Sequence, residues 1–260
     1  MKYYVVSDTH SFYTETIQAL TKKGFFTDTQ PHKLIICGDI FDRGGESKEM
    51  QDFILDLLKK DEVILIRGNH EDLFLELTEH ANKWFDKDIF YTHHARNGTI
   101  RTVMDLTGVD EIDLLNPEKM SALIKETPYY KTIIPKMVDY FETSKYIFVH
   151  GWIPCEACGY GGKAKIYHYI KNWRESNALD WNYARWYNGM DAWWQGVIEE
   201  GKCIFCGHWH TSFGHSRIRN EGMEFGPTAN FTPFADIGIW AIDGCVAVSG
   251  KVNCVVIEDD

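Results

Sequence analysis

Residues 33–45 read KLIICGDIFDRGG, an apolar run that delivers two carboxylates and an arginine into a glycine-bounded turn. The segment 34–37 is short and fully apolar, which predicts a buried strand. Asp39, Asp42 and Arg43 follow it directly. Open parallel α/β sheets bind their ligands at the carboxyl ends of strands. We therefore expect Asp39 to lie at the centre of a functional site in an α/β fold.

Four more predicted strands end in residues that can bind a metal ion. The strand at residues 3–7 is followed by Asp8-Thr9-His10, and the strand at 62–66 by the cluster Asn69-His70-Glu71. The strand at 145–149 is followed by His150, and the strand at 202–206 by Gly207-His208-Trp209-His210. Because the carboxyl ends of parallel strands share one edge of a sheet, we expect these clusters to converge. Between them, residues 46–60 carry apolar side chains at helical spacing, which predicts a helix packed on the sheet.

Length and composition favour one domain. The chain has 260 residues, of which 44% are hydrophobic, so its core needs no disulfide or metal staple. We expect a single domain over residues 1–260, with helical insertions at about 85–144 and 152–200. The alternating apolar pattern of residues 236–257 predicts an antiparallel meander that closes a second sheet.

The two insertions carry groups of aromatic rings. The second holds six of the nine tryptophans, Trp152, Trp173, Trp181, Trp186, Trp193 and Trp194. This density is typical of a flap packed over a cleft and equally of ordinary aromatic core. In the first insertion, the pair His93-His94 is predicted to be a surface or packing feature, because the residues directly beside it, 91–92 and 95–98, include no carboxylate.

The charge of the chain disfavours some classes of partner. Its net charge is −11, which argues against binding to a nucleic-acid backbone by counterion release. No run approaches the ~20 apolar residues of a membrane span. Residues 1–6 are too short for the apolar core of a secretory signal. We therefore expect a cytoplasmic protein with no membrane partner.

The seven cysteines are an odd number, so we expect reduced thiols rather than a disulfide framework. Two pairs, Cys155/Cys158 and Cys203/Cys206, have the spacing of a structural zinc site. The second pair lies on a predicted strand, where residues three apart point to opposite faces. We therefore favour buried or half-buried thiols over zinc ligands.

The strand-end residues form a set of carboxylates, imidazoles and one amide. Its members are Asp8, His10, Asp39, Asn69, His150, His208 and His210. Such mixed nitrogen and oxygen donors suit manganese, iron or zinc rather than calcium. Seven ligands are too many for one transition-metal ion but fit two ions that share a carboxylate, for which Asp39 is the natural bridge. Two cations ~4 Å apart hold a hydroxide and clamp a phosphoryl group, which favours phosphoester hydrolysis.

The order of the motifs resembles that of the calcineurin-like metallophosphoesterases. The motifs are D-x-H at 8–10, G-D-x-x-D-R-G at 38–44, G-N-H-E at 68–71, a strand-end H at 150 and G-H-x-H at 207–210. The forms GDIFDRG and RGNHE look like the serine/threonine protein phosphatase branch, particularly its bacterial and phage members. The resemblance runs from residue 3 to about 260. It implies an α/β (α+β) fold, a two-sheet α/β/β/α sandwich with helical insertions.

The resemblance also implies how the metals are divided. Asp8, His10, Asp39 and His210 would bind one ion, and Asp39, Asn69, His150 and His208 would bind the other. The implied cofactors are two divalent metal ions, manganese first, with iron, zinc, nickel and cobalt as alternatives.

The chain departs from the family pattern at two points. Many eukaryotic-type protein phosphatases lack the second histidine of G-H-x-H, so His210 is either a ligand or a group behind the ligands. This chain also reads His150-Gly151-Trp152 where relatives read H-A-G. That change is expected to bring a bulky ring near the metals.

For catalysis, the resemblance implies that His70 is the general acid and that Asp42 orients it. A serine or threonine alkoxide is a poor leaving group, so its protonation is worth ~10²–10⁴ in rate. Arg43 is expected to clamp the phosphate oxygens in a bidentate manner.

Further substrate contacts are implied at Arg185 and Asn69. Arg185 stands in the stretch W-N-Y-A-R-W, which resembles the W-x-R stretch of bacterial relatives and is expected to supply a second clamp. Asn97-Gly98 with Thr102 looks like the N-G-G…T stretch of the same relatives, and no role is assigned to it.

The leading hypothesis is a dinuclear-metal phosphomonoesterase in which a metal-bridging hydroxide attacks the phosphorus directly. Its expected partners are phosphoserine or phosphothreonine peptides or small phosphoesters. The alternative is a symmetrical dinucleoside tetraphosphatase or another small phosphoester hydrolase, because such enzymes share these motifs and differ mainly in the insertions. A non-catalytic scaffold of the same fold is disfavoured, since every motif is intact.

Overall fold

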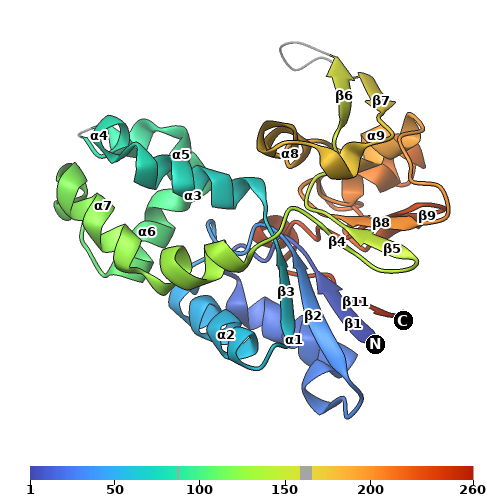
Figure 1. The fold of residues 1–260 in the computed structure, drawn as a ribbon, viewed down its shortest axis with the longest axis horizontal. Coiled ribbons are helices and arrows are strands. Elements are labelled where there is room, and N and C mark those ends of the chain that lie inside the picture. The colour runs from blue at the N-terminus through green and yellow to red at the C-terminus, as the bar shows by residue number, and fades with distance from the viewer. Residues whose placement is uncertain (87, 159–165, 260) are drawn as a thin grey trace.

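The computed structural model describes residues 1–86, 88–158 and 166–259, and its centre is two β-sheets (Figure 1). The first sheet has the strand order β11-β1-β2-β3. Its strands are β1 (Lys2–Val6), β2 (His32–Cys37), β3 (Val63–Ile66) and β11 (Val255–Glu258). β1, β2 and β3 are parallel and in register, with Val6 beside Ile36 and Cys37 beside Ile66. Their carboxyl ends therefore share one edge of the sheet.

The second sheet has the order β4-β5-β8-β10-β9. Its strands are β4 (Phe141–Glu142), β5 (Tyr146–Phe148), β8 (Cys203–Cys206), β9 (Phe234–Asp236) and β10 (Ile239–Ala241). β5, β8 and β10 are parallel, and the edge strands β4 and β9 are antiparallel to their neighbours. Apolar side chains of both sheets form one buried layer, in which the rings of Phe148 and Phe205 stack with centroids 5.2 Å apart.

Helices cover the outer faces of both sheets. On the first sheet, α1 (Tyr13–Lys23) and α2 (Ser47–Lys59) contribute to its outer core. α2 buries Met50, Ile54 and Leu57, as the helical spacing of residues 46–60 predicts. On the second sheet, α8 (Ala178–Ala184) and α9 (Gly189–Trp194) pack over β5, β8 and β10. This arrangement confirms the predicted α/β/β/α sandwich.

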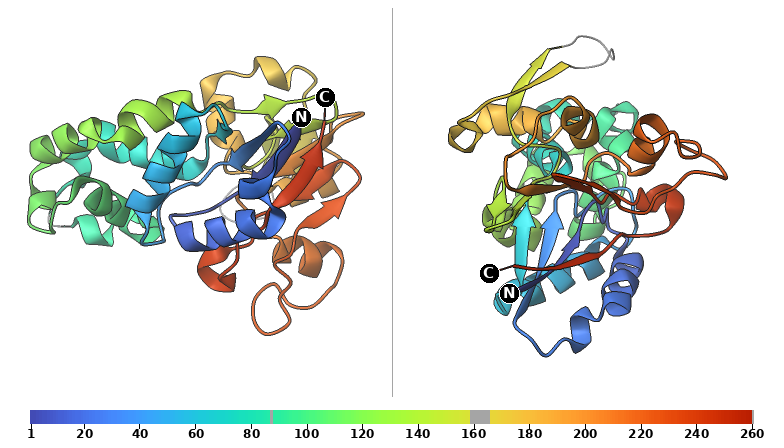
Figure 2. Two further views of the ribbon diagram at one scale, coloured as in Figure 1. Left: turned by 90° about the horizontal axis from the view of Figure 1, so that it is seen from below. Right: turned by 90° about the vertical axis from the view of Figure 1, so that its right-hand side faces the viewer.

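The segment between β3 and β4 is a helical lobe that extends away from the sheets (Figure 2, left). Its helices are α3 (Asn69–Glu79), α4 (Ala81–Trp84), α5 (His93–Asn97), α6 (Thr99–Thr107) and α7 (Pro117–Glu126). Short helical turns in the whole chain are η1 (Phe25–Thr27), η2 (Ile89–Tyr91), η3 (Asp113–Leu115), η4 (Tyr129–Ile133), η5 (Ile134–Lys136), η6 (Trp173–Glu175) and η7 (Gly214–Ile218). Within the described ranges, no helix is both long and apolar enough to cross a membrane.

The second insertion, residues 152–200, is only partly helical. Before α8 and α9, the strands β6 (Cys155–Cys158) and β7 (Ile166–Tyr169) pair antiparallel. The core between the second sheet and the helices α8 and α9 buries three tryptophans of the insertion, Trp152, Trp173 and Trp181. Trp152 also donates from Nε1 to the carbonyl oxygen of Val197 at 3.1 Å. Its ring is therefore part of this core, and aromatic core accounts for much of the tryptophan density.

The C-terminal segment differs from the predicted meander. Gly238, with a φ of +87°, turns the chain between β9 and β10. Residues Val246–Ser249 form the short helix α10. β11 then returns to the first sheet, where Ile257 pairs with Tyr3. The prediction is confirmed for β9 and β10, which form the antiparallel edge of the second sheet. It is wrong for α10 and β11, because an alternating apolar pattern indicates a strand without indicating its partner.

A cluster of charged side chains ties β4 to the second insertion. Arg174 donates from Nε to Glu142 Oε2 at 2.9 Å and from Nη2 to Glu199 Oε1 at 2.9 Å. Lys202 Nζ lies 2.8 Å from Glu142 Oε1. The hydrogen bonds from Arg174, followed by those from Lys202, lower the pKa of Glu142 to about 2.

Replacing Glu142 with glutamine should therefore flatten the acid dependence of stability. Since the pKa of Glu142 is lowered on folding, its carboxylate stabilises the fold above pH ~4.5, and this stabilisation is lost as the pH falls towards ~2. The cluster is partly exposed, so the effect should be ~1 kcal/mol or less. Thermal unfolding midpoints across this pH range test the prediction, with the exposed Glu111→Gln as control. Parallel curves for Glu142→Gln and the wild-type chain would contradict it.

Candidate active site

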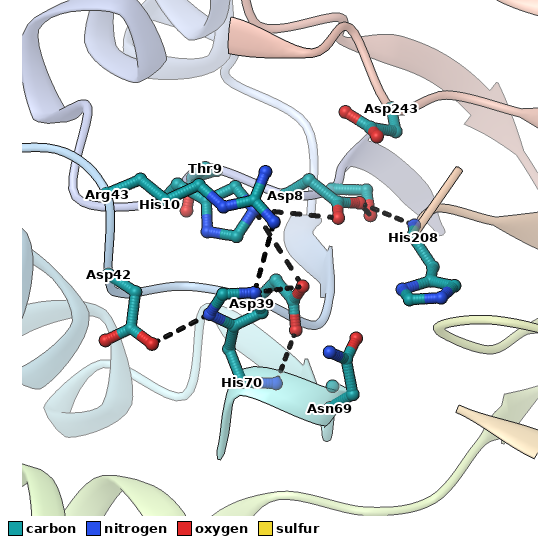
Figure 3. Close-up of polar contacts among 12 residues, drawn as sticks. Asp8, Thr9, His10, Asp39, Asp42, Arg43, Asn69, His70, His208 and Asp243 are labelled. Atoms are coloured by element: carbon teal, nitrogen blue, oxygen red, sulfur yellow. Dashed lines mark hydrogen bonds and ion pairs between the residues drawn. The ribbon is translucent and has the colours of Figure 1, made fainter. Parts of the chain in front are cut away.

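The polar clusters that follow five strands meet at the carboxyl edges of the two sheets. Figure 3 shows those that follow β1, β2, β3 and β8. The structure brings together Asp8 and His10 after β1, Asp39, Asp42 and Arg43 after β2, Asn69 and His70 after β3, His150 after β5, and His208 after β8. Of these residues, Arg43 is exposed, His208 is half-buried and the others are buried. The structure thus gathers side chains that lie up to 200 positions apart in the sequence.

The backbone of this site is strained. Six of the predicted site residues have left-handed backbone conformations, with φ between 47° and 75°: Asp8, His10, Asp39, Asp42, Arg43 and His208. Each costs ~1–3 kcal/mol and persists only where the surrounding structure enforces it. Backbone hydrogen bonds between two of the turns do so, from Asp8 N to Gly38 O at 3.1 Å and from His10 N to Asp39 O at 3.0 Å.

Asp39 lies between two groups of donor atoms. Its Oδ2 is 3.8 Å from His10 Nε2 and 3.8 Å from His70 Nε2, while its Oδ1 is 3.3 Å from His150 Nε2. The donor atoms of His10, Asp39 and His70 all lie within 4.8 Å of one another, as do those of Asp39, His150 and His208. One carboxylate therefore presents a different oxygen to each group, which is the arrangement of a bridging ligand.

The imidazoles of His10 and His150 present Nε2 to the site. His10 Nδ1 donates to the carbonyl oxygen of Phe41 at 2.9 Å, and His150 Nδ1 donates to that of Cys37 at 2.8 Å. Burial lowers the pKa of both histidines well below the ordinary value, so both are neutral. Metal-binding histidines are usually fixed by such a hydrogen bond on the second ring nitrogen.

These residues fit divalent metal ions. Burial raises the pKa of Asp8 and of Asp39 well above the ordinary value, and the neighbouring carboxylates Asp243 and Asp8, respectively, raise them further. Asn69 Oδ1 lies 2.8 Å from His150 Nε2, whose proton is on the other ring nitrogen. Two lone pairs therefore face each other. A cation at this place would be bound by these carboxylates and lone pairs, and its charge would offset the cost of burying them together.

Sequence reasoning missed Asp243, which lies beside Asp8 and His208 in Figure 3. Asp243 is buried, and burial raises its pKa to about 6. Asp8 accepts a hydrogen bond from the backbone nitrogen of His208 at 2.9 Å through Oδ2, and its Oδ1 lies 4.0 Å from His10 Nε2. The signal for Asp243 was its position just after the predicted strand that is now β10, followed by Gly244.

His210 is not brought into either group of donor atoms. Its Nδ1 lies 2.8 Å from Ser212 Oγ, and its Nε2 lies 3.5 Å from Glu224 Oε1. Its ring packs against Phe225, with centroids 4.5 Å apart. Both ring nitrogens thus face groups outside the site, which differs from the expected metal ligand.

His70, Asp42 and Arg43 form a chain of contacts beside Asp39. His70 Nδ1 lies 2.7 Å from Asp42 Oδ2, and Arg43 Nη2 lies 3.3 Å from His70 Nε2. The backbone nitrogen of His70 also donates to Asp39 Oδ1 at 3.0 Å. Asp42 therefore fixes the orientation of the His70 ring, while Nε2 faces the space shared by Arg43 and Asp39.

The helical lobe holds Asp42 in place through two hydroxyl groups. Thr99 Oγ1 donates to Asp42 Oδ2 at 2.8 Å, and Thr102 Oγ1 donates to Asp42 Oδ1 at 2.7 Å. Gly98 has a φ of +90°, and a Cβ at this position would collide with the backbone nitrogen of Arg43. The stretch Asn97-Gly98 with Thr102 thus supports the turn that carries Asp42, and Thr99 was missed from sequence.

Replacing Thr102 with valine should lower turnover ~10-fold on alkyl phosphates. Valine keeps the shape of threonine but lacks the hydroxyl group that donates to the buried Asp42 carboxylate. The loss of such a hydrogen bond costs ~1–3 kcal/mol. The matched control is Thr107→Val on the same helix, where the hydroxyl group donates only to the Val103 carbonyl oxygen at 2.7 Å. Thr102→Ser should restore kcat. Equal kcat values in Thr102→Val and Thr107→Val would remove the positioning role.

Glu71 ties the turn after β2 to the turn after β3. It is fully buried, and its carboxylate accepts from the backbone nitrogens of Gly68 at 2.7 Å, Asp39 at 3.1 Å and Ile40 at 3.1 Å. Burial raises its pKa. From the sequence, Glu71 was only a member of the G-N-H-E motif, with no role assigned. In the structure its carboxylate joins the turn that follows β2 to the turn that follows β3.

Arg185 is buried in an ion-pair network. Its Nε donates to Asp72 Oδ2 at 2.6 Å, and its Nη1 donates to Asp139 Oδ1 at 2.8 Å. Asn182 also donates to Asp72 Oδ2, at 3.0 Å. Arg185 lies close enough to His150 to contribute to its lowered pKa. Two of its nitrogens are thus already bound to carboxylates, which differs from the expected phosphate clamp.

The cysteine pairs do not make a metal site in the part of the chain that the structure describes. Cys155 and Cys158 lie on β6, whereas Cys203 and Cys206 lie on β8 in a different sheet. Over those ranges no group of metal-ligand atoms contains a cysteine.

Comparison with known families agrees with the motif order. Residues 1–236 match the model of the family described as calcineurin-like phosphoesterase. The chain belongs to this family. Members of this metallophosphoesterase family bind two divalent metal ions, and the protein is a metal-dependent phosphoester hydrolase.

Three solved structures that are similar to this calcineurin-like phosphoesterase have low sequence identity to it. A putative diadenosine tetraphosphatase is 10% identical, with a TM-score of 0.48, covering 98% of this chain and 89% of that chain. A metallophosphoesterase from Sphaerobacter thermophilus is 14% identical, with a TM-score of 0.42, covering 100% and 89%. A serine/threonine phosphatase from Saccharomyces cerevisiae is 14% identical, with a TM-score of 0.42, covering 80% and 61%. No curated protein sequence matches the chain.

Proposed function

We propose that this calcineurin-like phosphoesterase is a phosphomonoesterase of the serine/threonine protein phosphatase type, formed by a single domain. The observation that carries the proposal is the position of His70. Its Nδ1 lies 2.7 Å from Asp42, and its Nε2 lies 3.8 Å from the same Asp39 oxygen that faces His10. A proton donor held beside a bridging carboxylate suits cleavage of an ester whose leaving group is an alkoxide.

The proposed metal ligands are six residues. Asp8, His10 and Asp39 would hold one ion, and Asp39, Asn69, His150 and His208 the other. When bound, two divalent ions, for which we propose manganese, neutralise the phosphoryl charge and activate water. The neutral His10 and His150, with Nε2 facing the site, are ready to bind such ions without losing a proton.

The proposed proton path uses His70 and the phosphate contact uses Arg43. His70 donates from Nδ1 to Asp42, so the second ring nitrogen is the one that transfers a proton to the leaving alkoxide. Arg43 is exposed and its Nη2 lies 3.3 Å from that nitrogen. A phosphate that attracts the Arg43 guanidinium would release His70 Nε2 for the leaving group. Asn69, beside His150, is proposed to contact the same phosphate.

One observation favours a second candidate, a symmetrical dinucleoside tetraphosphatase. Trp186 is 40% exposed, and its ring meets that of His208 edge to face at a centroid distance of 5.7 Å. An exposed indole beside a phosphate-binding site offers a surface on which an adenine base can stack.

Phosphorus NMR of the manganese-loaded protein distinguishes the two candidates. The substrates are a phosphothreonine peptide and, separately, diadenosine tetraphosphate, with Asp39→Asn as the blank. We expect orthophosphate from the peptide. Formation of two ADP from the dinucleotide with the peptide untouched would overturn the first proposal in favour of the second. In that case Trp186→Ala should raise KM for the dinucleotide and leave hydrolysis of a small phosphomonoester unchanged.

A further inference from the structure

A second cluster of metal-ligating side chains lies in the helical lobe, outside the active site. His93 and His94 begin α5, and Glu76 stands on α3. His93 Nε2 lies 3.4 Å from Glu76 Oε2. One donor atom from each of the three residues lies within 4.8 Å of the other two. The carboxylate that the sequence did not offer to the histidine pair therefore comes from another helix.

His94 gives independent support for a ligand at this place. It is fully buried, and among the residues that the structure describes neither of its ring nitrogens has a hydrogen-bond partner. Burial, together with the neighbouring His93, lowers the pKa of His94 to about 4, so its ring is neutral. A buried imidazole without a partner costs free energy that a bound ion would offset. His93 and Glu76 are half-exposed, with side-chain exposures of 40% and 38%, which leaves a path to solvent.

We propose that Glu76, His93 and His94 form a third divalent metal site, suited to zinc or a similar ion. Two imidazoles and a carboxylate are a common donor set for zinc. A tetrahedral ion with bonds of ~2.1 Å separates its ligand atoms by ~3.4 Å. The distance between His93 Nε2 and Glu76 Oε2 matches this spacing. Water would complete the coordination on the solvent side, and only one nitrogen of His94 would bind the ion.

The site would link the lobe to the catalytic machinery. α3 begins with Asn69 and His70, and α5 runs directly into Gly98 and Thr99, which support the turn of Arg43 and Asp42. An ion between α3 and α5 would fasten these two supports to each other. Its expected role is therefore structural, and it is separate from the two ions proposed at Asp39.

The competing description has no metal. Glu76 and His93 would form an ordinary ion pair, and His94 would simply pack its ring against that of Trp84, whose centroid is 4.8 Å away. The two descriptions differ in how much zinc the protein holds, and this difference can be measured without assaying activity.

The test is equilibrium dialysis of the full chain against low micromolar zinc, followed by metal analysis of the wild-type protein, Glu76→Gln, His93→Ala and the matched control Glu79→Gln. Glu79 is exposed on the same helix, so its substitution removes the same charge. All the substituted side chains are at least partly exposed, and circular dichroism checks that each variant folds. We expect Glu76→Gln and His93→Ala each to hold one zinc ion per chain fewer than the wild-type protein and Glu79→Gln.

Equal zinc content in all four proteins would overturn the proposal, as would an equal loss in Glu79→Gln, which would indicate only diffuse attraction to surface charge. A zinc-edge anomalous map of the crystallised wild-type protein gives a second readout. It should show a peak between Glu76, His93 and His94, and its absence there at the dialysis concentration of zinc would also count against the site.

Discussion

Replacing Asp39 with asparagine should abolish metal-dependent phosphoester hydrolysis while the chain stays folded. The two Asp39 oxygens face separate groups, His10 with His70 on one side and His150 on the other. Asparagine keeps one oxygen and loses the negative charge, so it cannot bridge two cations. We expect kcat to fall at least ~10³-fold, as when a main electrostatic contact to a transition state is removed. The bound metal should fall as well.

The same change should leave the metal-free protein at least as stable as the wild-type chain. Burial and the neighbouring carboxylates Asp8 and Glu71 raise the pKa of Asp39, so its charge is unfavourable when no cation is present. Thermal unfolding in a chelator and metal analysis after loading test both parts. Asp61→Asn is the control, because Asp61 is exposed and has a comparable left-handed φ of 56°. Retained turnover with two bound ions in Asp39→Asn would remove the bridging role.

The centre of the site could be predicted from sequence because it depends on local signals. A short apolar run predicts a strand, and parallel strands place their carboxyl ends at one edge. The residues just after β1, β2 and β3 therefore had to meet, and Asp8, Asp39 and Asn69 do meet. His150 and His208 follow β5 and β8 in the same way, because the second sheet brings its own parallel strands to the same place.

Partners that come from another element could not be predicted in this way. The histidine pair of α5 was given no carboxylate, because Glu76 reaches it from α3 through packing of the lobe. Arg185 was expected to bind phosphate, but in the structure its guanidinium group donates to Asp72 and Asp139. The residue type limits the kinds of interaction that a side chain can make. Which possible partner lies closest to the side chain depends on the tertiary structure.

The positioning of Asp42 depends on the same kind of remote contact. The turn after β2 supplies Asp42, but the hydroxyl groups of Thr99 and Thr102 come from a helix that is 57 and 60 residues away in sequence. These contacts join the helical lobe to the site. The lobe restrains the carboxylate that in turn restrains His70.

Replacing His70 with asparagine should reduce hydrolysis of an alkyl phosphate ~10²–10⁴-fold and that of an activated aryl phosphate much less. An aryl oxide leaves with little protonation, whereas an alkoxide needs a proton as its bond to phosphorus breaks. Asparagine retains the backbone nitrogen that donates to Asp39 Oδ1 at 3.0 Å, and its amide can still donate to Asp42. The variant should therefore fold and keep its metals but lack the titratable group.

The measurement is kcat for phosphothreonine peptide and for para-nitrophenyl phosphate in the wild-type protein, His70→Asn and His80→Asn. His80 is exposed at the end of the same helix, so its substitution controls for the change of residue type. The ratio of the two kcat values should change only in His70→Asn. Equal losses on both substrates would mean that His70 acts before the leaving group departs. In that case the distance of 3.8 Å between His70 Nε2 and Asp39 Oδ2 would indicate that His70 is a metal ligand rather than the general acid.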